Sequence, residues 1–215
     1  HNKGISTADF WNKGVDWIFD TFFVYIKAFN TWLIVDVLQP MRALYLRMPA
    51  VATLVLAVGA GYLIGGIRSA LVVAALTLFI ALSPWWDRAL VTLYMATFGV
   101  VVSCLIGFTV GTLCFQNKKS AAFMLGVCDI FQTFPSFVYL IPVMMLFGIT
   151  DTSVLIAVIV YATIPATRYT IEGLRSVPVG LHEAATMSGV NKFQRLTKIE
   201  FPLAFPHMML GINQT

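Results

Sequence analysis

The sequence predicts an all-α polytopic membrane protein, and its composition and the spacing of its charges are the observations behind that fold class. Of 215 residues, 59% are hydrophobic and 11% are charged, whereas soluble domains carry about 25% charged residues. The apolar residues fall in uncharged blocks, most of them long enough to cross a bilayer as a helix, which takes about 17 to 25 residues. We expect about five transmembrane helices, an interfacial N-terminal helix and a cytoplasmic loop.

The first segment, residues 1–47, is aromatic but carries a polar stripe. Its polar residues recur every three or four positions, as on one face of a helix: Asp9, Asn12, Lys13, Asp16 and Asp20. The longest uncharged stretch, residues 28–35, is too short to span. An amphipathic helix lying in the membrane interface on the extracytoplasmic side fits, with Trp11, Trp17, Phe22 and Phe23 turned toward lipid. Packing of this helix against the transmembrane bundle is an equal alternative.

The next segment, residues 48–88, contains two apolar blocks. They cover residues 49–66 and 69–86, and only Ile67 and Arg68 separate them. A connection this short requires a tight hairpin, so we expect two accessory spans here.

Residues 89–215 form the predicted core of the protein. The third span covers residues 89–115, the fourth residues 121–147 and the fifth residues 153–167. Pro135 and Pro142 interrupt the fourth span, because proline cannot donate to the helical hydrogen-bond ladder. A new apolar run begins at Met208 and stops at Thr215, so we expect the chain to lack at least one further span.

The basic residues predict the orientation, because positively charged loops stay in the cytoplasm. Basic residues exceed acidic ones in the loop after the third span and in the segment 168–205, whereas the opposite side is balanced. We therefore expect the N-terminal segment outside and residues 168–205 in the cytoplasm of a bacterial cell, with the chain crossing its plasma (inner) membrane several times.

The cytoplasmic segment carries the most informative pattern. It consists of Glu183, Ala184, Ala185, Gly189, Ile199 and Pro202. Residues 181–187 can form a short helix, Gly189 permits a turn that a side chain forbids, and Asn191 can cap a second helix that Pro202 and Pro206 end. Two short helices at an angle can dock in a groove of another protein. Glu183 offers that partner a charge, and Ala184 and Ala185 permit close approach.

This pattern resembles the E-A-A-x3-G-x9-I-x-L-P signature of permease subunits of ABC importers, with Phe201 at the Leu position. The resemblance implies a transport subunit without catalytic residues, which works as a pair of permease copies with two ATPase subunits. It also implies that ATP and Mg²⁺ are bound by the partner subunit and that this chain binds no cofactor or metal. The loop would then couple ATP hydrolysis to reorientation of the spans.

The resemblance narrows in the fourth span, residues 129–142, and in residues 146–148 and 211–215. These residues are similar to the permeases of glycine betaine and proline betaine importers, the osmoprotectant branch. The branch implies an extracytoplasmic substrate-binding protein as a further partner and two more spans after Pro206. Betaine, proline, choline and related solutes remain open as substrates, as does the pairing of identical or different permeases.

Asp129 is the carboxylate that stands out within a predicted span, where an unpaired charge costs several kcal/mol. One interpretation is that Asp129, Gln132, Thr133, Pro135 and Tyr139 line the translocation path or a gate, with Pro135 loosening the helix. An equal alternative is that Asp129 lies within about two turns of the cytoplasmic end and is hydrated. The neighbouring aromatic residues are expected to pack rather than to form a cage for a quaternary ammonium.

Two other function classes fit less well. An intramembrane enzyme needs a nucleophile with a base or a metal cluster, yet no histidine falls in the five predicted spans. An ion-coupled secondary transporter of a small zwitterionic solute needs coupling carboxylates and an internal repeat, and only Asp129 is available. Nothing suggests a nucleic-acid partner, and the sequence has no phosphate-binding G-x-x-x-x-G-K-[ST] loop.

Overall fold

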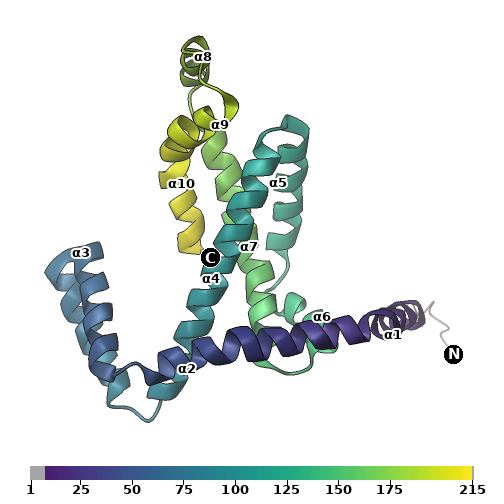
Figure 1. The fold of residues 1–215 in the computed structure, drawn as a ribbon, viewed down its shortest axis with the longest axis vertical. Coiled ribbons are helices and arrows are strands. Elements are labelled where there is room, and N and C mark those ends of the chain that lie inside the picture. The colour runs from purple at the N-terminus through teal and green to yellow at the C-terminus, as the bar shows by residue number, and fades with distance from the viewer. Residues whose placement is uncertain (1–7, 215) are drawn as a thin grey trace. The chain divides into compact units, whose positions relative to one another are not determined.

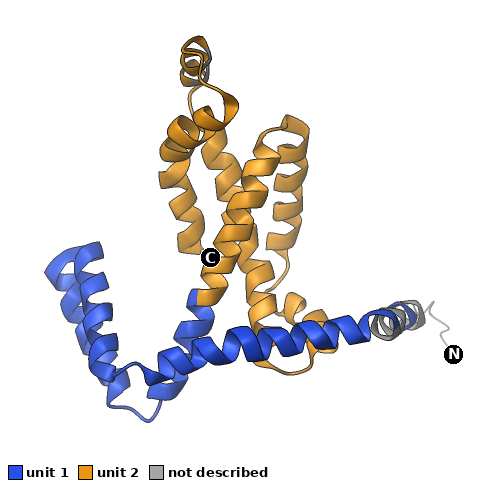
Figure 2. Ribbon diagram, viewed as in Figure 1, with its two compact units in different colours: residues 1–97 blue, residues 98–215 orange. Residues whose placement is uncertain are grey.

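The computed structural model describes residues 8–214, and these residues are helical apart from short turns (Figure 1). They fall into two compact units, which meet in the sequence between Thr97 and Phe98 (Figure 2). Within the described residues, four helical stretches are long and apolar enough to cross a membrane by length and composition, with Ala50–Ala81 counted across its kink, or five if one bent pair forms a single span. The predicted all-α polytopic class is confirmed, whereas the predicted division at residues 47 and 88 stays a prediction.

Unit 1 begins with one uninterrupted helical stretch. It comprises α1 (Ala8–Trp32), the π-helical turn η1 (Leu33–Leu38) and α2 (Gln39–Arg47). Part of it, Thr21–Arg47, is long and apolar enough to span a membrane, with a mean hydropathy of 1.4. The expectation that this region is too short to span is therefore wrong. The helix extends well beyond the uncharged stretch of residues 28–35, and a span can include a few charged residues. The interfacial location stays a prediction.

Of the four aromatic residues expected to face lipid in this segment, two have described side chains. Phe22 and Phe23 are 45% and 53% exposed, so other parts of the chain do not cover them fully. The side chains of Trp11 and Trp17 lie outside the described residues.

The two predicted accessory spans form the arms of α3 (Ala50–Ala81). Gly65 and Gly66 leave the helical conformation, with Gly66 at φ 67°, a value that favours glycine because other residues have a Cβ. The chain reverses there, since a Cβ on Gly61 would lie 3.0 Å from a methyl carbon of Val73. The reversal is close to the predicted one, but the helical arms are about 22 Å long, shorter than a hydrocarbon layer of about 30 Å.

Unit 2 contains the end of α4 (Trp86–Phe115), α5 (Lys118–Thr133), α6 (Phe137–Phe147), α7 (Asp151–Arg175) and α10 (Phe201–Gln214). The fourth predicted span is not one loosened helix. It is broken into α5 and α6, which meet at an angle of 90°. The break lies at Pro135, because proline removes a ladder donor and restricts the preceding residue to extended backbone; Phe134 has φ −83° and ψ 138°. Pro142 stays inside α6.

Helix α7 is the buried centre of unit 2, and α4 lies close against it through small residues. Gly99, Ser103, Gly107 and Gly111 recur every fourth position on α4 and form one stripe. The Ser103 hydroxyl donates to the Ile159 carbonyl of α7 at 3.3 Å. A Cβ on Gly107 would lie 2.5 Å from the Cβ of Ala166. Such stripes let two membrane helices approach until their backbones touch.

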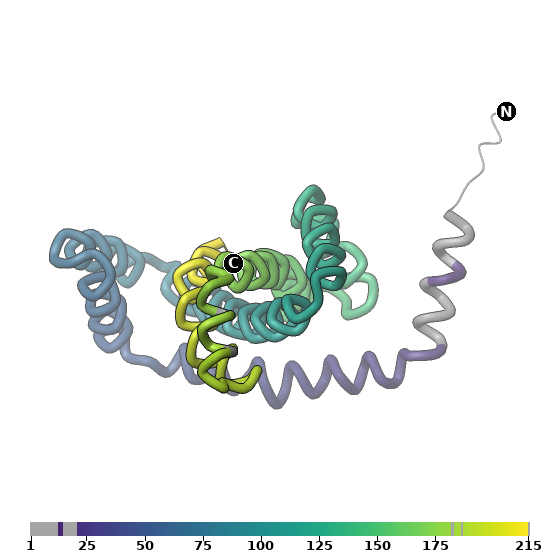
Figure 3. The backbone as a smooth tube through the Cα atoms, turned by 90° about the horizontal axis from the view of Figure 1, so that it is seen from above, coloured from purple at the N-terminus to yellow at the C-terminus, as the bar shows by residue number. Residues whose placement is uncertain are grey.

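Helix α10 packs against α7 in the same way, on a face next to the one that meets α4 (Figure 3). A Cβ on Gly173 of α7 would lie 3.1 Å from the carbonyl oxygen of Ala204. A Cβ on Gly211 of α10 would lie 3.0 Å from the Cβ of Tyr169. Glycines therefore set the spacing between α7 and each of these two helices.

We predict that Gly107→Val destabilises unit 2, because its side chain would overlap the α7 backbone, and overpacking of this kind costs about 1 to 3 kcal/mol. Thermal unfolding of the purified protein in detergent should show a lowered Tm. Gly126→Val on α5 is the matched control, since a Cβ there meets nothing within 4 Å. Equal Tm values for the two variants would contradict the close-packing explanation.

Candidate functional site

The motif predicted to be cytoplasmic lies on a helical excursion that starts at the end of α7. Helix α7 extends to Arg175, so Arg168 is part of a helix and not of a loop. The excursion consists of α8 (Val179–Met187), α9 (Lys192–Arg195) and η2 (Leu196–Glu200), and η2 continues into α10. The prediction that Pro202 and Pro206 end the second helix is wrong. Pro202 lies in the first turn of α10, and Pro206 stays inside it.

The turn between α8 and α9 has the predicted chemistry. Gly189 has φ 71°, in the left-handed region that side chains disfavour. Asn191 then caps α9: its side chain accepts from the Gln194 backbone N–H at 2.8 Å, and the Gln194 side chain accepts from the Asn191 backbone N–H at 3.2 Å. This reciprocal capping box satisfies two otherwise unpaired donors and fixes the angle at which α9 begins.

The motif residues on α8 face different ways. Glu183 and Ala184 are exposed, as a contact with another protein requires. Ala185 is 4% exposed, and the expectation that it permits close approach of a partner stays a prediction. Ala185 is buried because α8 turns this side toward its own chain, where the Ala185 carbonyl accepts from the Val190 N–H.

The exposed side of α8 is strongly apolar for a surface helix. Val179, Leu181 and Met187 are 69%, 40% and 93% exposed. Exposed apolar groups of this kind, next to polar ones, are typical of an interaction surface.

The remaining motif residues, Ile199 and Pro202, lie where the excursion joins α10. Ile199 is half-buried on η2, and Pro202 is exposed where α10 begins. Phe201, at the position of the signature leucine, packs against a buried cluster formed by Leu174, Val177, Ala204 and Met208. An aromatic residue is therefore accommodated at this position by apolar contacts.

A buried ion pair inside η2 was missed from the sequence. Glu200 is 2% exposed, and its carboxylate accepts from Arg195 Nε at 2.9 Å. Residues five apart do not face each other in an α-helix, but the wider π-helical turn brings them together. The unusual position of a glutamate between Ile199 and Phe201 was the available signal.

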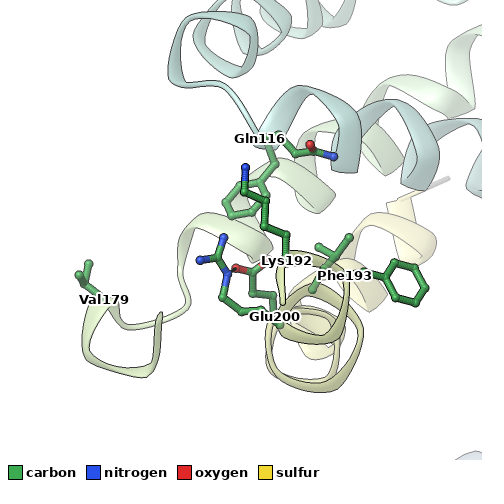
Figure 4. A pocket seen from close by; sticks show the side chains of 8 residues that line it. Gln116, Val179, Lys192, Phe193 and Glu200 are labelled. Carbon is green, nitrogen blue, oxygen red and sulfur yellow. Dashed lines mark hydrogen bonds and ion pairs between the residues drawn. The ribbon is translucent and has the colours of Figure 1, made fainter. Parts of the chain in front are cut away.

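A cavity of about 560 Å³ lies beside this excursion. The residues that line it come from the end of α4, the start of α8 and the α9–η2 segment: Phe115, Gln116, Val179, Lys192, Phe193, Arg195, Leu196 and Glu200. Figure 4 shows the Lys192 side chain directed toward Gln116 and Phe193 directed away from it. Space therefore remains between α9 and the end of α4.

The polar residues predicted for the path meet on α5 and α7. Arg168 Nη1 donates to Asp129 Oδ1 at 2.6 Å and to Gln132 Oε1 at 3.0 Å. Arg168 Nε donates to Glu172 Oε1, one turn away on α7, at 3.0 Å. The side chains of Asp129, Arg168 and Glu172 are 60%, 32% and 36% exposed. We call Asp129, Gln132, Arg168 and Glu172 the polar cluster.

The remaining predicted path residues have other environments. Thr133 donates to the Ile130 carbonyl of its own helix at 2.6 Å, and Pro135 marks the break between α5 and α6. Tyr139 donates its hydroxyl proton to the Phe131 carbonyl, and its ring lies 5.9 Å from those of Phe131 and Tyr161. Tyr139, Phe131 and Tyr161, the aromatic trio, therefore hold the broken span against α7.

Comparison with known proteins gives one family. The family described as binding-protein-dependent transport system inner membrane component matches residues 99–213. The trimethylamine N-oxide transport system permease protein TmoV of Pelagibacter ubique is 87% identical over 215 residues, which are 100% of this chain and 30% of that protein.

Two further relatives are more distant. TmoV of Ruegeria pomeroyi is 43% identical over 185 residues, 86% of this chain and 28% of that protein. The glycine betaine/proline betaine transport system permease protein ProW of Escherichia coli is 31% identical over 216 residues, 100% of this chain and 60% of that protein. The chain thus spans less than a third of the two TmoV proteins and 60% of ProW.

We predict that Asn191→Ala loosens the start of α9, because the loss of a capping side chain costs about 1 kcal/mol. Hydrogen exchange of the backbone around Phe193 should then speed up about fivefold in the detergent-solubilised protein. Lys198→Ala, at an exposed position of η2, should leave that exchange unchanged. Equal exchange rates in both variants would show that the capping box does not hold the turn.

Proposed function

This chain belongs to the family of binding-protein-dependent transport system inner membrane components, and we propose that it forms part of the permease of an ATP-driven importer of small methylated amines. The family match covers most of unit 2, which contains the coupling motif and the polar cluster. The importer lies in the bacterial inner membrane, with the N-terminal segment outside and the α8–α9 excursion in the cytoplasm. The excess of basic residues around that excursion supports this orientation.

Trimethylamine N-oxide is the proposed substrate, and glycine betaine is the second candidate. The carrying observation is the 87% identity, over the whole chain, to a protein described as a trimethylamine N-oxide permease. The betaine relative shares 31%. Both solutes are zwitterions with three methyl groups on a positively charged nitrogen and a negatively charged oxygen, so one permease architecture can serve either.

The α8–α9 excursion is the proposed contact with the ATPase subunits. Glu183, Ala184 and the highly exposed Met187 present a mixed polar and apolar surface. Gly189 and the Asn191 capping box fix the angle between the two helices, and α10 continues the second one toward the bundle. A push on α8 is therefore passed to α10 and, through its contacts with Gly173, to α7.

The complete assembly would contain two ATPase subunits that bind ATP and Mg²⁺, a second permease copy and an extracytoplasmic binding protein. The proposed translocation path follows the side of α7 on which α5 and α6 lie. Asp129, Gln132, Pro135 and Tyr139 border this path, whereas Thr133 bonds back to its own helix. An ion-coupled transporter is the competing function, and it would need no ATPase.

We predict that trimethylamine N-oxide stimulates ATP hydrolysis when the full-length permease is reconstituted in vesicles with its ATPase and binding protein. Uptake of labelled solute, measured in the same vesicles, should require ATP. Stimulation by glycine betaine alone would keep the importer and change its substrate. ATP-independent uptake driven by an ion gradient would contradict the proposed function and favour the ion-coupled transporter.

We predict that Gly189→Val uncouples this importer, because valine at φ 71° would strain the turn and reorient α8. Solute-stimulated ATP hydrolysis and uptake should both fall at least about tenfold if reorientation removes one well-made contact. Gly189→Asn is the matched variant, since asparagine tolerates the left-handed region, and it should retain most of the uptake. Normal uptake in Gly189→Val would rule out the coupling role of this turn.

A further inference from the structure

We propose that the polar cluster, with the Asp129–Arg168 ion pair at its centre, is the place where the permease receives both charges of its zwitterionic solute. Arg168 would meet the negatively charged oxygen, and Asp129 the positively charged nitrogen. This inference rests on the proposed function and adds a site within the membrane domain. Arg168 was assigned to a cytoplasmic loop from the sequence, so its role follows from the structure alone.

The polar cluster lies several turns away from the nearest ends of α5 and α7. Helices α5 and α7 end at one level, because Arg175 Nη2 donates to the Lys118 carbonyl at 3.4 Å. Asp129 lies about 16 Å along α5 from Lys118, and Arg168 about 10 Å along α7 from Arg175, at 1.5 Å per residue. Asp129 is thus about three turns into its helix, deeper than the two turns expected. Charges at this depth require water or protein around them.

The Asp129–Arg168 ion pair is exposed on the surface of unit 2. Asp129 is 60% and Arg168 32% exposed, so unit 2 by itself does not cover the pair. Lipid contact would be expensive at this depth. An aqueous path for solute accounts for charges at this depth.

The Arg168 guanidinium uses only some of its donors within the polar cluster. A guanidinium has five N–H donors, and those of Arg168 on Nη1 and Nε bond to the other members of the polar cluster. Among the described residues, no acceptor bonds to Arg168 Nη2. This nitrogen remains available to an oxygen that enters from the path.

The Asp129–Arg168 ion pair is chemically complementary to a zwitterionic solute. A zwitterion brings one charge of each sign, so it can enter an ion pair without leaving either partner unmet. A lone carboxylate would instead favour a cation. Tyr161, two turns before Arg168 on the same face of α7, is 41% exposed and stands beside Tyr139. Aromatic faces attract methylated ammonium groups, so this neighbour suits the same solute.

The test uses the full-length permease reconstituted with its ATPase and binding protein, and trimethylamine N-oxide as the probe. We expect Arg168→Gln to lower the maximal uptake rate at least about tenfold, because a charge of the solute is left unmet. The KM should stay unchanged if the binding protein sets it. ATP hydrolysis should fall less than uptake, so that more ATP is consumed per solute molecule transported.

Two control variants separate passage from a structural role. Arg175→Gln removes a guanidinium from the same helix whose recorded bond is to a backbone carbonyl, and it should transport normally. Asp129→Asn keeps the shape of the side chain and should reproduce the Arg168→Gln defect, even if the latter folds poorly. Tm values should separate a loss of folding from a loss of passage.

The double variant Asp129→Asn/Arg168→Gln provides the decisive outcome. It replaces both charged groups with neutral amides that can donate and accept hydrogen bonds, so it presents no charge pair. Restored uptake would show that the pair only ties the helices together and would overturn the inference, as would normal uptake in Arg168→Gln. In both cases a wild-type importer that takes up trimethylamine N-oxide with ATP would leave the proposed function intact, whereas ATP-independent uptake by the wild type would refute that function.

Discussion

The close approach of α4 and α10 to α7 is the constraint on which the rest of unit 2 depends. Membrane helices gain little from hydrophobic burial against each other, so their association relies on backbone proximity and packing. Gly107 and Gly111 of α4 and Gly211 of α10 meet adjacent faces of α7. With α7 fixed in this way, its end sets the start of α8, and Arg168 reaches α5.

Interruptions of the helical ladder lie next to each candidate functional feature. Pro135 breaks the fourth span beside the polar cluster, Gly189 turns the chain between α8 and α9, and the π-helical turn η2 precedes Pro202. Such interruptions let a helix change direction or width without leaving the membrane bundle. In η2 the wider turn also provides the i to i+5 spacing that lets Arg195 neutralise the buried Glu200.

The motif of residues 183–202 divides into a part that is exposed and a part that shapes the excursion. Glu183 and Ala184 are exposed, whereas Ala185 is buried, Gly189 makes the turn and Ile199 supports the base. A sequence pattern records that a residue type is required without recording the direction in which it points. The capping role of Asn191 was predictable, because a capping box depends on residues within one turn.

The sequence by itself determined the membrane class, the family resemblance and the turn at Gly189, because each depends on composition or on residues near one another in the chain. The four-residue spacing of Gly99, Ser103, Gly107 and Gly111 was also readable, although its partner on α7 was not. Only the tertiary structure decided which residues of the two arms of α3 meet and that Arg168 pairs with Asp129. Those contacts join residues on different helices or on different arms, and helix packing fixes which distant side chains meet.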